Sequence, residues 1–217
     1  MKVSYQRYIF EFVMAVIVFS GSFVVNYYAG QYVRSVGASS PAIPSDLLLD
    51  FLPRMDLSLF FLWGFVAFIA FATVSALVWE RDRIIYLLWM FALLISLRGL
   101  FIILTPMGQP KGAFPIESFL FEKMGQYMTF GNDLFFSSHT AMPFLSFLIY
   151  RNIWARVIFL LFSLTMALAV LLCRYHYSID VASAFFITYA LVRIHGNRMR
   201  PAYKSFVEWI FPTKESF

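Results

Sequence analysis

The stretch LSLFFLWGFVAFIAFATVSALVW, Leu57 to Trp79, contains no charged residue. A helix needs about 20 consecutive apolar residues to cross the hydrocarbon core of a bilayer, so this stretch is long enough to do so. The whole chain has the same character, because 61% of its 217 residues are hydrophobic, 20% are aromatic and only 13% are charged. This composition leaves too little polar surface to coat a soluble globule, and it predicts an integral membrane protein.

Five more apolar runs predict an all-α, polytopic membrane protein with six transmembrane helices. The fourth run is short and is expected to begin inside the polar segment SSHT. No linker, low-complexity tract or repeat interrupts the series, so residues 1–217 are expected to form a single membrane-embedded domain. The predicted spans are Tyr8–Tyr28, Leu57–Trp79, Ile84–Leu104, Ser138–Tyr150, Ala155–Cys173 and Val181–Ile194.

The distribution of Lys and Arg residues predicts the orientation of these spans. With a cytoplasmic N-terminus, eleven of the seventeen Lys and Arg residues fall on the cytoplasmic side. The positive-inside rule therefore predicts that both termini are cytoplasmic. The net charge of +5 is spread over several short loops, which indicates a membrane-anchoring bias and no nucleic-acid partner.

Three polar segments are predicted to converge on the non-cytoplasmic side of the membrane. They are Arg98–Pro110, Asp133–Thr140 and Arg174–Asp180. Each has an ordinary explanation when taken alone, since hydroxyl residues cap helices and arginines reach from a span to the interface. Ionisable groups at membrane depth are usually functional, however, so their convergence predicts a site.

The two histidines of these segments are the predicted proton carriers. His176 and Asp180 are four residues apart, so on a helix that begins near Tyr175 they share one face, and the carboxylate can fix the tautomer of the imidazole. An imidazole oriented in this way can act as a base or as a nucleophile. His139 comes from another span and is expected to protonate a departing oxygen.

Other residues of the same segments are suited to binding a phosphate. Arg98 and Arg174 offer planar donors that match phosphate oxygens, and the backbone amides after Ser137 would open a helix whose positive dipole end attracts anions. Together with the histidines they predict phosphoryl transfer by covalent catalysis, with no cofactor and no metal. A zinc site formed by His139, His176 and Asp180 is the alternative, but the sequence has no HExxH pair and its single cysteine carries no metal signature.

Two stretches resemble a known family. NDLFFSSHT, Asn132 to Thr140, and HYSIDVASAFF, His176 to Phe186, are similar to the two histidine motifs of the sphingomyelin synthase-like branch of the lipid phosphate phosphatase superfamily. That branch carries GD…FSGHT and HYT.DV…AYY stretches. RGLFIILTPMGQP, from Arg98, and IPSDLLLDFLP, from Ile43, are similar to two further segments of the branch, so the resemblance runs from Pro41 to about Arg193.

The resemblance implies a role for each matching residue. His176 would be the nucleophile, Asp180 its orienting partner and His139 the acid that protonates the leaving group. Asp133 matches the acidic residue ahead of the first motif and is assigned, with Ser137 and Ser138, to the phosphate-binding set.

The sequence departs from the family pattern at three positions. Ser138 stands where the family usually has glycine, and Gly131 where the branch often has cysteine. Val170 occupies the position of an arginine in the wider phosphatase pattern, which favours the synthase-like branch.

The expected function is transfer of a phosphate-linked headgroup from a phospholipid to a lipid hydroxyl, ceramide or diacylglycerol, through a phosphohistidine. The active site would face the non-cytoplasmic side of a plasma, inner or Golgi-like membrane. Hydrolysis by water, as in a lipid phosphatase or phospholipase, is the alternative and uses the same residues. A non-catalytic transporter or scaffold would instead place its charges along a pathway through the bilayer. The sequence leaves the oligomeric state open.

Overall fold

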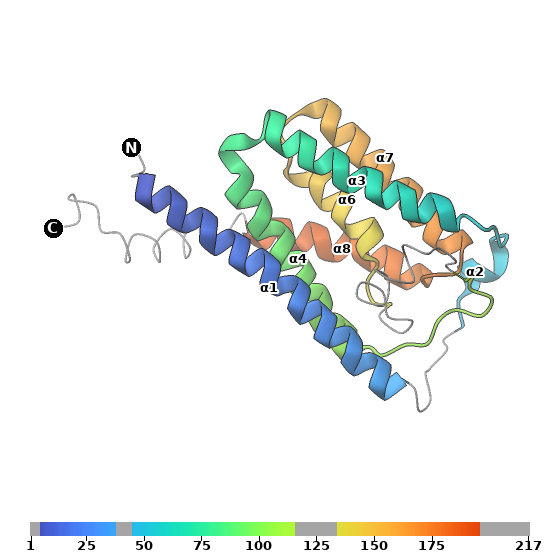
Figure 1. The fold of residues 1–217 in the computed structure, drawn as a ribbon. Coiled ribbons are helices and arrows are strands. Elements are labelled where there is room, and N and C mark those ends of the chain that lie inside the picture. Colours follow the sequence, from blue (N-terminus) through green and yellow to red (C-terminus); the bar gives the residue numbers. More distant parts are fainter. Residues whose placement is uncertain (1–4, 38–44, 116–133, 196–217) are drawn as a thin grey trace.

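A computed structural model describes residues 5–37, 45–115 and 134–195. All regular secondary structure within these residues is helical (Figure 1), so the prediction of an all-α fold is confirmed for them. The helices are α1 (Tyr5–Gly37), α2 (Leu47–Phe51), α3 (Ser58–Trp79), the short 3-10 helix η1 (Arg81–Arg83), α4 (Ile84–Leu104), α6 (Ser138–Ile149), α7 (Ile153–Leu172) and α8 (Ser178–Ile194).

Helices α1 and α4 lie side by side along much of their length (Figure 1). Gly99 of α4 allows this close approach, because a Cβ atom at Gly99 would already lie 3.4 Å from the side chain of Val25 and 3.5 Å from the backbone of Asn26. The outer face of α1 is apolar, and Ile17 is 57% exposed. Such an apolar surface is favourable against the hydrocarbon of a bilayer and unfavourable against water.

The other helices form a second group around α6. Helix α6 packs against both α7 and α8, α3 packs against α7, and α4 joins the two groups through its contact with α6. The core between them consists of buried apolar side chains, among them Phe68, Met90, Leu94, Phe136, Leu145 and Phe159.

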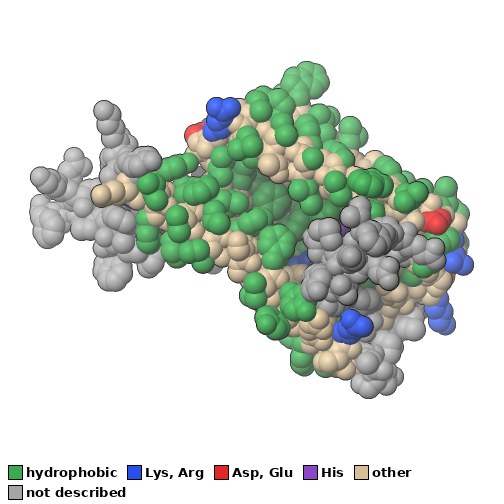
Figure 2. All heavy atoms as spheres, in the orientation of Figure 1, with side chains coloured by type: hydrophobic (Ala, Val, Ile, Leu, Met, Phe, Trp, Pro, Cys, Tyr) green, Lys and Arg blue, Asp and Glu red, His purple; other side chains and the backbone are tan. Residues whose placement is uncertain are grey.

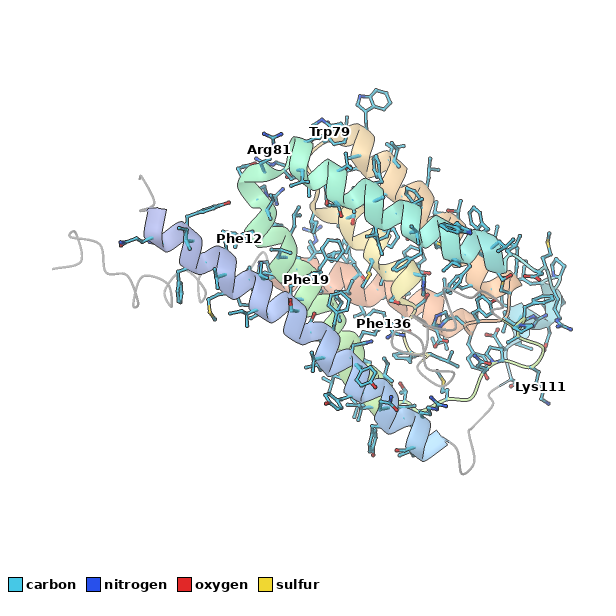
Figure 3. The ribbon with its side chains drawn as sticks, in the orientation of Figure 1. Phe12, Phe19, Trp79, Arg81, Lys111 and Phe136 are labelled. Atoms are coloured by element: carbon cyan, nitrogen blue, oxygen red, sulfur yellow. The ribbon has the colours of Figure 1, made fainter. Side chains whose placement is uncertain are left out.

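A buried carboxylate ties the helix ends together at one end of this bundle. Glu80 follows α3 and is fully buried, and it accepts hydrogen bonds from the backbone N–H of Arg151 (2.6 Å), from Nε of Arg151 (3.1 Å) and from Nη1 of Arg83 (3.2 Å). Arg151 also contacts Asp82. We call this the Glu80 end. The opposite end, where α3, α6 and α8 begin and α4 and α7 finish, is called the histidine end. Figure 3 shows Arg81 and Lys111 at opposite ends of the molecule.

Four helical segments of the described residues are long and apolar enough to cross a membrane: Gln6–Val36, Ser58–Trp79, Arg81–Leu104 and Ile153–Leu172. Hydrophobic side chains cover much of the face shown in Figure 2. Helices α6, with 12 residues, and α8, with 17, are shorter than the roughly 20 residues of a full span. The chain therefore has the helices of a multi-pass membrane protein, while the count of six spans and the cytoplasmic termini remain predictions.

Candidate active site

His176 and Asp180 meet at the start of α8. Nδ1 of His176 lies 3.4 Å from Oδ2 of Asp180, an ion-pair distance without the alignment of a hydrogen bond. Both residues are buried, Asp180 completely. The predicted pairing is therefore present, but the expected geometry was wrong. Helix α8 begins at Ser178, so His176 lies in the turn before the helix and not on its face.

A helix cap explains why the pair forms without a shared helical face. Oδ2 of Asp180 accepts a hydrogen bond from the backbone N–H of Tyr177 (2.9 Å), which folds the carboxylate back over the first turn of α8. This position brings Asp180 next to His176. One carboxylate therefore caps the helix and contacts the histidine.

His139 reaches the same end of the bundle from the first turn of α6. His176 and Arg98 are near enough to interact electrostatically with its imidazole. The ring packs against the phenyl rings of Phe61 and Phe65, with centroid distances of 4.2 and 4.3 Å. Its Nδ1 is buried and has no hydrogen-bond partner among the described residues. The two histidines thus lie at the same end of the bundle, His139 in α6 and His176 in the turn before α8.

Ser137 connects the two histidine motifs through the backbone. Its N–H donates to the carbonyl oxygen of Asp180 (3.3 Å), and its hydroxyl oxygen accepts a hydrogen bond from Thr140 (3.3 Å). Helix α6 begins at the next residue, Ser138, as the phosphate-binding prediction requires. The first-turn N–H groups of a helix have no intrahelical acceptor, so they can bind an anion.

Arg98 holds the segment that leads into α6. This buried residue of α4 donates from Nε to the carbonyl of Phe136 (3.1 Å) and from Nη1 to the side chain of Asn26 in α1 (3.0 Å). Phe136 lies where α4 approaches the beginning of α6 (Figure 3). The guanidinium therefore positions the first motif. Its role as a hydrogen-bond donor to a phosphate remains a prediction.

Arg174 turns the chain from α7 towards His176. Its φ of 60° lies in the left-handed region, which is uncommon for a residue with a side chain. Its Nη2 donates to the carbonyl of Leu52 (3.1 Å), so the side chain anchors the segment that follows α2. Asp133 lies outside the described residues, and its predicted role is untested.

One segment of the chain that contains both histidine motifs matches a known family. Residues 131–196 match the family described as PAP2 superfamily C-terminal. No curated protein and no solved structure matched the chain. The PAP2 match covers less than half of the chain, and it contains His139, His176 and Asp180.

The match supports membership of the PAP2, or lipid phosphate phosphatase, superfamily. This superfamily generally comprises phosphatases that act on phosphate esters, which fits a membrane protein with lipid substrates. The match does not distinguish the sphingomyelin synthase-like branch, so that finer assignment stays a prediction. The residues that hold the PAP2 motifs in place, Arg98 and the segment around Leu52, lie outside the matched part.

Among residues 5–37, 45–115 and 134–195, no group of three or more His, Cys, Asp or Glu side chains is arranged to hold a metal ion. The reaction without a metal stays a prediction. Cys173 is buried beside this site, where its Sγ accepts a hydrogen bond from the backbone N–H of Leu57 (3.2 Å). This contact gives the cysteine a packing role.

Sequence reasoning missed the part that Asp46 plays at this site. Its carboxylate accepts hydrogen bonds from the backbone N–H of Ser178 (2.6 Å) and from the Ser178 hydroxyl (2.9 Å), and it also caps α2 by accepting from Leu48 and Leu49. Burial opposes ionisation of Asp46, but these hydrogen bonds outweigh it and lower the pKa of the carboxyl group below its ordinary value. An aspartate before an apolar run is a helix-cap signal, yet nothing in the sequence points to Ser178.

Proposed function

We propose that this protein transfers a phosphate-linked headgroup from a phospholipid to a lipid hydroxyl, ceramide or diacylglycerol, on the non-cytoplasmic face of its membrane. The observation that carries the proposal is the pairing of His176 with Asp180 beside a second histidine, His139. A nucleophile oriented by a carboxylate and a separate proton carrier are what covalent phosphoryl transfer requires.

The contact with Asp180 indicates which nitrogen of His176 attacks. Nδ1 faces the carboxylate, so Nε2 is the nitrogen left to bond to phosphorus. As the nitrogen–phosphorus bond forms, the bond from phosphorus to the diacylglycerol oxygen breaks, and His139 gives its proton to that oxygen. The headgroup phosphate then remains on His176.

The second step reverses the roles. The hydroxyl of the acceptor lipid gives its proton to His139, and its oxygen attacks phosphorus. The nitrogen–phosphorus bond breaks, and His176 is restored. Throughout both steps, the first-turn amides of α6 after Ser137 and the arginines Arg98 and Arg174 would bind the phosphate oxygens.

Hydrolysis is the second candidate, and the PAP2 match favours it because members of that superfamily are generally phosphatases. Water would replace the lipid hydroxyl in the second step, with no change in the residues used. The two reactions differ only in what accepts the phosphoryl group.

One experiment separates them. Purified protein is incubated with labelled phosphatidylcholine, phosphatidylethanolamine or phosphatidic acid, each with and without ceramide or diacylglycerol, in water enriched in oxygen-18. Transfer predicts an acceptor-dependent lipid product without the heavy isotope. Hydrolysis predicts a phosphate product that carries it. If none of these lipids is consumed, the proposal is wrong.

A further inference from the structure

Two phenylalanines of α3 pack against the imidazole of His139. Phe61 and Phe65 are four residues apart, so their side chains lie one above the other on the same face of the helix. Their rings are tilted by 43° and 57° against the imidazole, at 4.2 and 4.3 Å between centroids. Helix α3 therefore presents two aromatic rings, and no polar group, to His139 in this contact.

The ring of His139 has no polar anchor on its Nδ1 among the described residues. A functional histidine is usually oriented by a hydrogen bond on the nitrogen that does not react. Here the two phenyl rings provide the contacts that define the plane of the imidazole. Rotation of His139 would have to displace one of them.

Phe61 also reaches the second motif. Its ring lies 5.0 Å from the ring of Tyr175, the residue immediately before His176, and the side chain is 3% exposed. Phe65 has no such bridge in the described contacts and instead packs towards Phe68, at 5.7 Å. A single phenyl ring thus contacts both His139 and the neighbour of His176.

We infer that Phe61 is a positioning residue that holds the imidazole of His139 in the orientation needed to protonate the leaving oxygen, at a fixed separation from His176. This inference rests on the proposed role of His139 as the acid. Small errors in the position of a reacting group cost up to about 100-fold in rate, so an apolar residue can control catalysis without touching the substrate.

Phe68 is the matched control for a residue that only packs. It lies on the same helix and is 2% exposed, but its ring contacts are Phe65, Phe159 and Phe162, at 5.7, 6.0 and 6.1 Å, and it makes no direct ring contact with a histidine. Phe61→Leu and Phe68→Leu remove the same ring from equally buried positions. Only Phe61→Leu should alter the orientation of His139, the proposed acid.

The kinetic test compares donors that need an acid with donors that do not. The lipid donors are phosphatidylcholine and phosphatidic acid, and their activated counterparts are nitrophenyl phosphorylcholine and nitrophenyl phosphate, whose leaving groups depart with little protonation. Phe61→Leu should lose at least 10-fold in kcat on the lipid donor and less than 3-fold on the activated one, with little change in KM. Phe61→Tyr keeps the ring and should recover most of the loss, and Phe68→Leu should leave the ratio of the two rates unchanged.

Equal losses on both donors, or a selective loss in Phe68→Leu, would overturn the inference. His139→Ala separates this failure from a failure of the proposed function. If His139→Ala loses activity selectively on the lipid donor and Phe61→Leu does not, His139 remains the proposed acid and the positioning role of Phe61 is wrong. If His139→Ala shows no selectivity, or no lipid donor is turned over, both are wrong.

A spectroscopic measurement tests the same inference without turnover. The chain has three histidines, so nitrogen-15 labelling of histidine gives a simple spectrum in which His139→Ala identifies the His139 signals. Phe61→Leu should shift or broaden these signals, and Phe68→Leu should not. Unchanged His139 signals in folded Phe61→Leu protein would contradict the inference, and Phe61→Met serves if the leucine variant does not fold.

Discussion

The carboxylate of Asp46 accepts two hydrogen bonds from Ser178, one from the backbone N–H at 2.6 Å and one from the hydroxyl at 2.9 Å. Ser178 stands two residues after His176 and two before Asp180, at the first position of α8. The segment between α1 and α3 thereby braces the turn that carries the proposed nucleophile.

Removal of this brace should cost stability and turnover together. Asp46→Ala is expected to lower the free energy of unfolding by about 1 kcal/mol, the usual value of a helix cap, and to lower kcat more than KM because His176 loses its support. Thermal unfolding in detergent and steady-state kinetics measure the two effects. Ser178→Ala removes only the hydroxyl bond and should lie between the wild type and Asp46→Ala.

The same carboxylate predicts a pH dependence. The pKa of Asp46 is lower in the folded protein than its ordinary value of 3.8, so its contribution to stability is complete above that value and is lost as the pH falls through the folded pKa. Acid unfolding curves of wild-type protein and Asp46→Asn should therefore converge below about pH 4. Curves that stay equally far apart at every pH would show that Asp46 does not stabilise the fold through its charge.

A substitution of Asp180 should separate the effect of its charge on His176 from its role as a helix cap. Asp180→Asn keeps an oxygen that can accept from the N–H of Tyr177, so the start of α8 should be preserved while His176 loses its negative partner. We expect a fall of at least about 100-fold in kcat, in line with the effect of the same change in a serine-protease triad. Trapping the acid-labile, base-stable phosphohistidine on His176 provides the readout, and His176→Ala should form no adduct.

Activity should persist in excess chelator. The proposed steps use two histidines, and groups of the chain donate hydrogen bonds to the phosphate, so a metal has no role in these steps. Turnover measured before and after dialysis against EDTA checks this expectation. Loss of activity that zinc restores would return the metal alternative to consideration.

Membrane orientation can be tested at two exposed positions that lie at opposite ends of the molecule, Arg81 and Lys111 (Figure 3). If the Glu80 end is cytoplasmic, Lys111→Cys should react with a membrane-impermeant thiol reagent in intact cells and Arg81→Cys should not. The single native cysteine, Cys173, is buried and should give a low background. The opposite pattern would move the site to the cytoplasmic face.

The Glu80 network should matter for stability and not for chemistry. Glu80→Ala removes the buried acceptor of the Arg151 backbone N–H and of the Arg83 guanidinium, and should cost about 1–3 kcal/mol. Asp82→Asn changes an exposed partner of Arg151, where water screens the charges, and should cost much less. Turnover per folded molecule, measured beside thermal stability, should be unchanged in both, because the network lies at the far end from His139.

The sequence predicted the apolar helices well, because hydrophobic run length is a local property. Helix α4 begins and ends at the predicted residues, Ile84 and Leu104, whereas α1 continues beyond the predicted end at Tyr28 to Gly37. The spacing of His176 and Asp180 also predicted their contact, although through the wrong geometry: capping by Asp180 depends on where α8 begins, and an apolar pattern locates helix ends poorly.

Tertiary contacts were beyond such reasoning. Phe61 is one of 27 phenylalanines, and nothing in its sequence context distinguishes it from those that face the bilayer. Asn26 lies inside a long apolar run, and its partnership with Arg98 depends on the packing of α1 against α4. The candidate site thus follows from residue types, and its support follows only from the fold.

The bond between Asp46 and Ser178 also bears on biosynthesis, since 132 residues separate the two partners. A ribosome makes the N-terminal part of a chain first, so Asp46 must wait until α3, α4, α6 and α7 have been synthesised before its partner emerges. A nascent chain that ends with α7, at Leu172, would contain the first histidine motif but neither His176 nor Ser178, the residue that Asp46 braces. The proposed activity should therefore appear only late in membrane insertion, when α8 arrives.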